Sequence, residues 1–394
     1  MFSSSRLILL IGLAFLMVHC QKEETLPPSS GPNGPPPPEQ SFPITYQVDF
    51  PEGKFPYPHH DPAYTEEDHQ RLIQDVFIIN NFGQYQCGDL PEDCYFHDGL
   101  DFVLDNGTPI YALQAGTVRA NIGGDQYYRS LVVEDLEAPE MAWVYTHVYH
   151  FNVAVGERVR KGQFLGRVNF QGIEHIHLTR SRLRSGGAWN NFSDLISLFP
   201  DDYFILRDET PPVILHPFHF FKNGTNELID HGAVDTISGA VDIVVSMRDP
   251  GDYTRGWLDN NFYGERLCVK KINYRILHNG EELLSKASFD FSQIEFVFSP
   301  DRWREAAIVF KHHDLLEPEA GNFNRFHSHY IITNARDSVS GFIEPSDSEL
   351  AWNTTATDEN GQPLFPNGPY QIEVTAYDTH ENATTKTDEV FLQN

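Results

Sequence analysis

Short apolar runs separated by glycine, proline and asparagine fill the chain from about residue 75 to residue 184. Examples are Phe102–Leu104, Pro109–Leu113 and Ser130–Glu134. No part of this stretch keeps a 3.6-residue apolar repeat, so the pattern favours strands over helices. The whole chain of 394 residues holds 28 Gly, 26 Pro, 29 Phe and 17 Tyr, a composition that also suits short strands and turns. We therefore predict an all-β unit over residues 81–184.

A second strand-rich block covers residues 211–394. Ala240–Ser246 and Tyr370–Tyr377 alternate apolar and polar residues, and Asn279-Gly280 is a hairpin signal. We expect an Ig-like or fibronectin-like β-sandwich here, with an insertion from about residue 301 to residue 324. Residues 185–210 are predicted to connect the two blocks, with one short helix around Asn191–Leu198. We find no catalytic set of residues in the second block.

The first residues are typical of an export signal. Arg6 precedes an apolar run, Leu7–Val18, of 12 residues, whereas a membrane-spanning helix needs about 20. The run ends at Cys20, which resembles the lipidation site of bacterial lipoproteins, so residues 1–19 are predicted to be a signal peptide. We expect an exported bacterial lipoprotein of the outer membrane.

The segment that follows Cys20 is predicted to be a spacer. Gln21–Glu24 resembles the short signal that sends some lipoproteins to the outer face of the outer membrane, so a periplasmic and a surface-facing position both stay open. Residues 20–43 include four consecutive prolines and form a stiff, lipidated tether. Residues 44–80 form a lead-in to the first block. The sequence leaves open whether this lead-in, with His59 and His60, masks an active site.

Charge and cysteine usage limit the partners and the compartment. The chain has 56 Asp and Glu against 28 Lys and Arg, a formal net charge of −28. Nucleic acids and anionic membrane surfaces are polyanions, so both are excluded as partners, and membrane contact is expected only through the lipid on Cys20. The close spacing of Cys87 and Cys94 predicts a disulfide in an oxidising compartment. Cys268 is then left over, and we expect it to be buried and inert.

Histidine and aspartate residues in the first block have the spacing of a metal site. His175 and His177 lie on one face of a strand, because alternate strand residues share a face. His97 and Asp101 are four apart and again share a face, and His147 is a further imidazole on another apolar strand. Three protein ligands with one open position are the pattern of a catalytic zinc site. Spacing alone does not say which of His175 and His177 binds the metal.

A His-x-His pair by itself is weak evidence. With 18 His in the chain, about one such pair is expected by chance. A second pair, His327-Ser-His329, is interpreted as structural. The His and Asp residues of the first block are stronger evidence than a lone His-x-His pair, because their order along the chain and the residues around them also form a distinctive pattern.

From Asn81 to Arg182 the block resembles the LytM/lysostaphin-type zinc metallopeptidases, whose β fold is called the duplicated hybrid motif. The matching motifs occur in the family's order. They are Asn81-Phe-Gly83, His97-Asp-Gly-Leu-Asp101, Gly107-Thr-Pro109 through Val118, Tyr145-Thr-His147, Val155-Gly156 through Gly166, and His175-Ile-His177. Ile176 stands where leucine is usual, Phe170–Glu174 replaces a Gly-rich turn, and the Cys87–Cys94 loop is inserted before His97. These departures put the groove shape and the substrate in doubt more than the chemistry.

The resemblance implies a role for each of the five polar residues. His97, Asp101 and His177 are the expected ligands of one Zn2+ ion, and His147 and His175 are the expected catalytic imidazoles. The implied activity is that of a zinc metalloendopeptidase, in which zinc-activated water attacks a peptide bond of a peptidoglycan cross-link. The expected partners are therefore peptidoglycan peptides or another peptide substrate.

Three other functions compete with this one. A non-catalytic scaffold or activator of cell-wall hydrolases would have lost ligands, but none is missing here. A surface metalloprotease that cleaves a non-wall protein would use the same residues. A biotinyl or lipoyl carrier would share the hairpin of Val155–Val168, but there is no Met-Lys motif at its tip. The bond cut, the ligand of the second block and the oligomeric state are not determined by the sequence.

Overall fold

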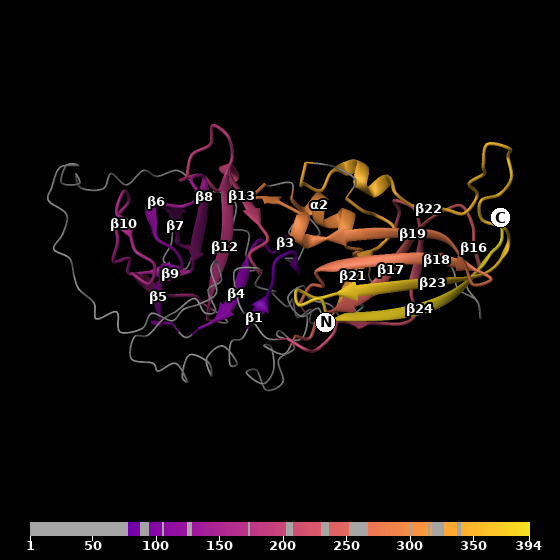
Figure 1. Ribbon diagram of the computed structural model, residues 1–394, viewed down its shortest axis with the longest axis horizontal. Coiled ribbons are helices and arrows are strands. Elements are labelled where there is room, and N and C mark those ends of the chain that lie inside the picture. The colour runs from indigo at the N-terminus through magenta and orange to yellow at the C-terminus, as the bar shows by residue number, and fades with distance from the viewer. Residues whose placement is uncertain are drawn as a thin grey trace, which may run out of the picture.

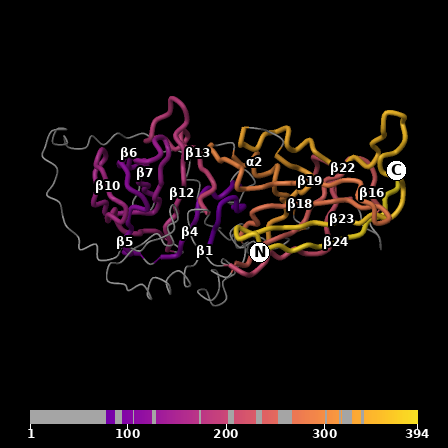
Figure 2. Tube along the Cα trace, in the orientation of Figure 1, coloured from indigo at the N-terminus to yellow at the C-terminus, as the bar shows by residue number. Residues whose placement is uncertain are grey.

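The computed structural model describes residues 78–86, 94–104, 106–123, 128–171, 174–201, 208–229, 236–251, 267–299, 302–313, 316, 327–336 and 340–394. Strands make up most of the regular structure, which confirms an all-β fold class. Two lobes are visible in Figure 1, one formed by the indigo and magenta strands and the other by the orange and yellow strands. The chain trace in Figure 2 shows the same two lobes in contact along one side.

The first lobe is built on one large sheet. Its main path in the described chain runs β1 (Ile78–Asn80), β4 (Leu100–Val103), β12 (His175–Leu183), β8 (Met141–Thr146), β7 (Ser130–Asp135), β6 (Gly116–Ile122) and β10 (Arg158–Val159). At the middle of this sheet, β12 lies antiparallel between β4 and β8. Residues of β12 therefore have neighbours on both sides, and this position is where the motif His175-Ile-His177 falls.

A small sheet covers the large one. It consists of β5 (Pro109–Tyr111), β11 (Phe164–Val168) and β9 (Val148–Tyr149). Ile110, Leu165 and Val168 pack with residues of the large sheet, such as Leu100 and Tyr145, in one buried cluster. Burial of this shared apolar face holds the two sheets together.

The second lobe is a two-sheet sandwich, as the alternating pattern predicts. One sheet holds β14 (Val213–Ile214), β17 (Ala240–Arg248), β15 (His219–Lys222), β21 (Ser328–Ile331) and β22 (Trp352–Asn353). The other runs β16 (Thr236–Ile237), β24 (Ala383–Leu392), β23 (Gly368–Tyr377), β18 (Lys271–His278) and β19 (Glu281–Asp290). Alternate residues of β17, β18 and β23 enter a single core between the sheets. The more specific Ig-like or fibronectin-like assignment stays a prediction.

The two lobes share both a core and a sheet. The hairpin β2 (Tyr85–Gln86) and β3 (Tyr95–Phe96) belongs to the first block by sequence, yet Phe82 and Phe96 lie in the core of the second lobe. Both rings stack on Phe296, with ring centroids 4.6 Å apart in each pair. Phe296 lies on β20 (Phe296–Val297), which pairs with β13 (Leu195–Leu198) and so joins the large sheet of the first lobe.

The region predicted to be an insertion contains the helix α2 (Arg302–Val309), which contacts β3. No helix in the described part of the chain has the length and hydropathy that a membrane span requires.

The connector differs from its prediction. The short helix expected around Asn191–Leu198 is only a 3-10 turn, η2 (Phe192–Asp194), and β13 follows it at once. Leu195 and Ile196 are buried, and their backbone pairs with β12, so this segment forms a strand instead of a helix. At the other end, β1 belongs to the large sheet although the sequence assigned it to the lead-in. Two further 3-10 turns are η6 (Phe291–Gln293) and η8 (Pro345–Glu349).

Several predictions fall outside the described residues. They concern the signal peptide at residues 1–19, the lipid on Cys20, the tether at residues 20–43, and most of the lead-in with its two histidines. Cys94 is disulfide-bonded, but Cys87 is not among the described residues, so that pairing stays a prediction. Cys268 is a buried free thiol, as expected.

Candidate active site

Strand register brings four of the five predicted site residues together. Within the large sheet, His177 on β12 pairs with Asp101 on β4 on one side and with Thr146 on β8 on the other. His147 comes directly after Thr146. It has a φ of 64°, in the left-handed region that few residues other than glycine adopt, and this conformation turns the chain from β8 into β9.

His97, the fifth residue, comes from the β2–β3 hairpin. Its backbone amide donates to the carbonyl of Gln84, and its carbonyl accepts from the amide of Gly83, each at 2.8 Å. These two hydrogen bonds extend the hairpin by one residue and fix the His97 ring over β4. The site is thus assembled from three separate parts of the chain.

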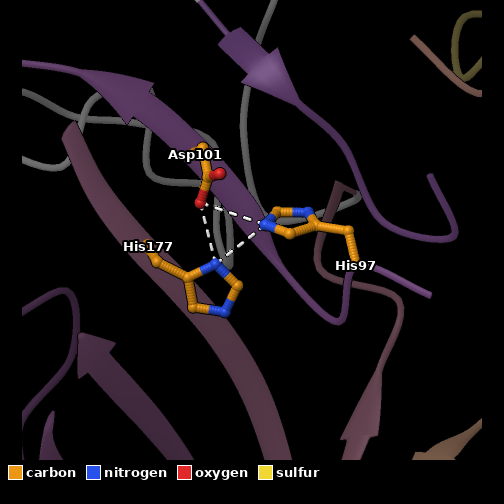
Figure 3. A group of neighbouring side chains, drawn as sticks. All are labelled: His97, Asp101 and His177. Atoms are coloured by element: carbon orange, nitrogen blue, oxygen red, sulfur yellow. Dashed lines mark hydrogen bonds and ion pairs between the residues drawn. The ribbon is translucent and has the colours of Figure 1, made fainter. Parts of the chain in front are cut away.

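Three candidate ligand atoms converge on one point (Figure 3). The Nδ1 atom of His177 lies 2.9 Å from Nε2 of His97 and 2.8 Å from Oδ1 of Asp101. The third side of this triangle, from His97 Nε2 to Asp101 Oδ1, is 3.1 Å. Ligand atoms about 2.0 Å from a tetrahedral zinc ion lie about 3.3 Å apart, so these separations come within a few tenths of an ångström of that geometry.

Hydrogen bonds on the far side of each ring set which nitrogen is left to bind. Nδ1 of His97 lies 3.0 Å from the carbonyl oxygen of Asn81, which can only accept, so the ring proton is assigned to Nδ1. Nε2 of His177 lies 3.3 Å from Asp98 Oδ1 and is assigned its proton in the same way. Two nitrogen lone pairs and one carboxylate oxygen then face each other. Such a set repels itself unless a proton or a cation lies between, and it suits a metal such as zinc.

The pKa values of these side chains show that the cluster favours a positive charge. Burial alone would lower the pKa of His177, but hydrogen bonds to Asp101 and Asp98 outweigh burial and raise it to about 10. Burial alone would raise the pKa of the Asp101 carboxyl, but the charges of His97 and His175 and two hydrogen bonds hold it well below its usual value. The cluster therefore keeps a proton where a divalent cation would replace it.

Two more imidazoles stand beside the cluster. The rings of His147 and His175 meet edge to face, with centroids 4.6 Å apart, and each residue is 7% exposed. Nε2 of His175 lies 3.6 Å from Oδ2 of Asp101. Phe170 packs against both rings, at 4.2 Å from His147 and 4.6 Å from His175. Phe170 lies in the segment Phe170–Glu174, which replaces the family's Gly-rich turn.

Sequence reasoning missed the residues that hold the ligands in place. Asn80 donates to Oδ2 of Asp101 at 2.6 Å, Asn81 accepts from His97, and Asp98 contacts His177. Asn81 and Asp98 lie within the quoted motifs, but a motif assigns no partner to them. Only the fold shows that the Asn81 side chain also exchanges two hydrogen bonds with the backbone of Cys268, each 2.8 Å long.

Comparisons with known proteins relate this part of the chain to a peptidase family. Residues 95–188 match the model of peptidase family M23. The chain is 31% identical over 91 residues to the glycyl-glycine endopeptidase ALE-1 of Staphylococcus capitis, a match that covers 21% of this chain and 24% of that protein. The chain thus spans about a quarter of the length of this curated relative.

Solved structures are similar to a part of the chain. LytU is 30% identical, with 29% of this chain and 81% of that chain covered and a TM-score of 0.25. The catalytic domain of the antimicrobial peptidase lysostaphin from Staphylococcus simulans is 23% identical, with 28% of this chain and 84% of that chain covered and a TM-score of 0.23.

The class of protein follows from the family match together with the all-β fold and the clustered histidines: this chain carries a peptidase domain. More narrowly, residues 95–188 are a peptidase family M23 domain, and the LytM/lysostaphin-type resemblance seen in the motifs is confirmed.

Proposed function

We propose that the protein is a zinc-dependent endopeptidase that cleaves peptide bonds in peptidoglycan cross-links. The observation that carries this proposal is the convergence of His97 Nε2, Asp101 Oδ1 and His177 Nδ1 within 3.1 Å of one another. A scaffold without activity has no need of three converging ligand atoms. The presence of a second imidazole pair beside them also favours an enzyme.

The proposed chemistry divides between the ligands and the second imidazole pair. Zinc held by the three ligands would act as a Lewis acid and lower the pKa of a bound water toward about 7. His147 and His175 are placed to accept a proton from the nucleophile and to return one to the leaving amine. Asp101 serves both sets, because Oδ1 faces the ligand rings and Oδ2 faces His175. Phe170 shields one side of both imidazoles from water.

The bond that is cut belongs to the proposal as well. The relative from Staphylococcus capitis is a glycyl-glycine endopeptidase by name. The outer-membrane position that we propose below would place this chain in a Gram-negative envelope, whose wall has no glycine bridge. We therefore propose a D-alanyl–diaminopimelate cross-link as the substrate bond. The competing proposal is a non-wall protein substrate, and the experiment below distinguishes the two.

Digestion of intact sacculi tests the proposed function. The purified chain is incubated with sacculi, with and without a chelator, and the released muropeptides are identified by mass. We expect cross-linked dimers to disappear and defined monomers to appear, and the chelator to stop both changes. No release by a folded, zinc-loaded chain would point to a non-wall substrate. No release by a chain that cannot hold zinc would favour the scaffold function.

We also propose that the chain acts at the outer membrane, anchored through a lipid on Cys20. The support is Arg6 followed by the apolar run Leu7–Val18 and then the cysteine. Replacing Cys20 by serine should abolish labelling with radioactive palmitate and release the chain from the membrane fraction. Protease treatment of whole cells separates the periplasmic from the surface-facing position. Unchanged labelling of Cys20→Ser would contradict the anchor.

A further inference from the structure

Three aspartates from distant parts of the chain meet at one end of the second lobe. Asp208 precedes β14, Asp249 follows β17 directly, and Asp378 follows β23 directly. One carboxylate oxygen from each lies within 4.8 Å of the other two. All three side chains are buried, and Asp249 and Asp378 are 0% exposed. None of them belongs to the site described above.

The local hydrogen bonds hold these carboxylates in place but do not neutralise them. Asp378 accepts from the backbone amides of His380 and Asn382 at 2.8 and 2.9 Å, and Asp208 Oδ1 accepts from the amide of Thr210 at 2.9 Å. The side chain of Asn382 bridges Asp378 Oδ2 and the carbonyl of Asp208, at 2.8 and 2.9 Å. Every one of these donors is an uncharged amide.

Asp249 has an oxygen that these bonds leave unused. Its Oδ1 accepts from the amide of Gly251 at 3.3 Å, while its Oδ2 has no hydrogen-bond partner among the described residues. No ion pair joins Asp249 or Asp378 to a Lys or Arg side chain in the described parts of the chain. A fully buried, unpartnered carboxylate oxygen in a cluster of three carboxylates is costly unless a cation binds there.

We propose that Asp208, Asp249 and Asp378 bind one Ca2+ ion. Oxygen ligands 2.3–2.6 Å from such an ion can lie up to about 5 Å from each other, which matches the observed spacing. Mg2+ keeps several of its waters and is held by one or two carboxylates, whereas this buried site offers three. Burial and the charges of Asp208 and Asp378 raise the pKa of Asp249 well above its usual value, so its charged form is disfavoured in the absence of a cation.

The bound ion would stabilise the contact between the lobes. Asp249 pairs with Leu267 through two backbone hydrogen bonds of 2.8 and 3.1 Å. The backbone of the next residue, Cys268, is hydrogen-bonded to the side chain of Asn81. The backbone carbonyl oxygen of Asn81 in turn accepts from Nδ1 of His97. Bound Ca2+ would therefore hold in place the end of β17 and the paired segment that contacts the M23 domain.

Calcium binding to the full-length, zinc-loaded chain tests this proposal. Calcium per chain is measured by equilibrium dialysis, and thermal unfolding is compared with the chain in EGTA at a few millimolar Ca2+. We expect one saturable Ca2+ per chain and a higher unfolding midpoint in Ca2+, and the same concentration of Mg2+ should give no such rise. Absence of saturable Ca2+ binding, or a response to Mg2+ alone, would overturn the assignment.

Two variants decide whether the aspartates are responsible. Asp249→Asn should lose the bound Ca2+ and the Ca2+-dependent rise, yet unfold in EGTA no earlier than the wild type, because one repelling charge is gone. Asp242→Asn is the matched control, since Asp242 is a buried aspartate on the same strand, β17, and accepts from the amide of Gly224. It should keep the Ca2+ response. Retained binding in Asp249→Asn, or loss in both variants, contradicts the proposed site. Zinc content and peptidase activity are not used, so either proposal can fail alone.

Discussion

At the scale of single residues, His177 lies in a strongly negative environment. Its ring lies between two carboxylates, Asp101 at Nδ1 and Asp98 at Nε2, while His97 approaches the same Nδ1 atom. A proton on Nδ1 satisfies Asp101 but not His97, because both groups then compete for one donor. A divalent cation satisfies all three ligand atoms at once. Metal binding and proton release should therefore be linked at this residue.

The ligands and the imidazole pair should respond differently to mutation. Asp101→Asn or His97→Ala should lose both zinc and activity, since each removes a ligand. His175→Ala should lose activity while keeping zinc, because general acid–base catalysis contributes about 10²–10⁴-fold. Zinc content by mass spectrometry and cleavage rate, measured on the same samples, check both expectations. Full activity in any of these variants would remove the basis for the assigned roles.

The pH dependence of the metal-free chain follows from the direction of the shifts. The pKa of His177 is raised to about 10, so its protonation stabilises the fold fully below about 6.5, and this contribution is lost as pH rises through about 10. The pKa of Asp101 is lowered, so its contribution is lost only as pH falls through the acid range. The metal-free chain should thus unfold at lower urea at pH 9 than at pH 6. The zinc-loaded chain should not show this loss, because zinc takes the place of the proton. Equal urea midpoints of the metal-free chain at both pH values would contradict this account.

At the scale of elements, the pairing of β4 with β12 sets the distance between Asp101 and His177. Gly99 directly precedes β4 and packs closely against β12. A Cβ atom at Gly99 would lie 2.4 Å from the carbonyl oxygen of Leu178 and 2.9 Å from both the His177 ring and the Thr179 hydroxyl. Glycine is therefore required by close approach to the neighbouring backbone.

Gly99→Ala should push β4 away from β12. We expect a loss of about 1–3 kcal/mol in the free energy of unfolding, typical of overpacking, together with weaker zinc binding. Urea denaturation and zinc titration measure the two effects. Gly156→Ala is the control, because Gly156 has a positive φ of 91° but no atom within 4 Å of its added Cβ. It should lose some stability and keep its zinc affinity, and equal zinc affinity in both variants would contradict the argument.

One buried amide contributes to the interface between the lobes. The side chain of Asn81 satisfies both the amide and the carbonyl of Cys268. Asn81→Ala should cost about 1–3 kcal/mol for each buried group left unpaired. It keeps the backbone carbonyl that accepts from His97 but removes the side-chain bonds that hold this backbone in place, so zinc binding should also weaken. Asn334→Ala, which removes a buried hydrogen bond to the Ile308 carbonyl within the second lobe, is the matched control. Only the first variant should change zinc affinity.

At the scale of the whole molecule, the M23 domain is not independent of the second lobe. Phe82 and Phe96 are almost fully buried, and both stack on Phe296 of the second lobe. The large sheet also continues through β13 into β20. Removing the second lobe would expose an aromatic surface and an unpaired strand edge, two features that promote aggregation.

A fragment ending at residue 210 should therefore fail to fold as the full chain does. We expect it to aggregate or to bind a hydrophobic dye, and to lose most of its zinc affinity. Size-exclusion chromatography and zinc titration beside the full-length chain measure this. A soluble monomeric fragment with unchanged zinc affinity would show that the shared core is dispensable.

The sequence predicted the parts of this molecule that depend on local pattern. Strand alternation and turn residues indicated two β blocks, and the motif order indicated His97, Asp101, His147, His175 and His177. Contacts between distant segments were not predictable, because no local pattern encodes them. The Asn81–Cys268 pair is separated by 187 residues, and β13 becomes a strand only because β12 and β20 offer partners.

The central claim is that a zinc ion at His97, Asp101 and His177 enables peptide-bond cleavage. The most direct test titrates zinc into the metal-depleted, full-length chain and measures cross-link cleavage in sacculi at each step. We expect cleavage to rise with bound zinc and to level off at one ion per chain. Cleavage that is already complete without zinc, or that stays absent with the site fully loaded, would contradict it.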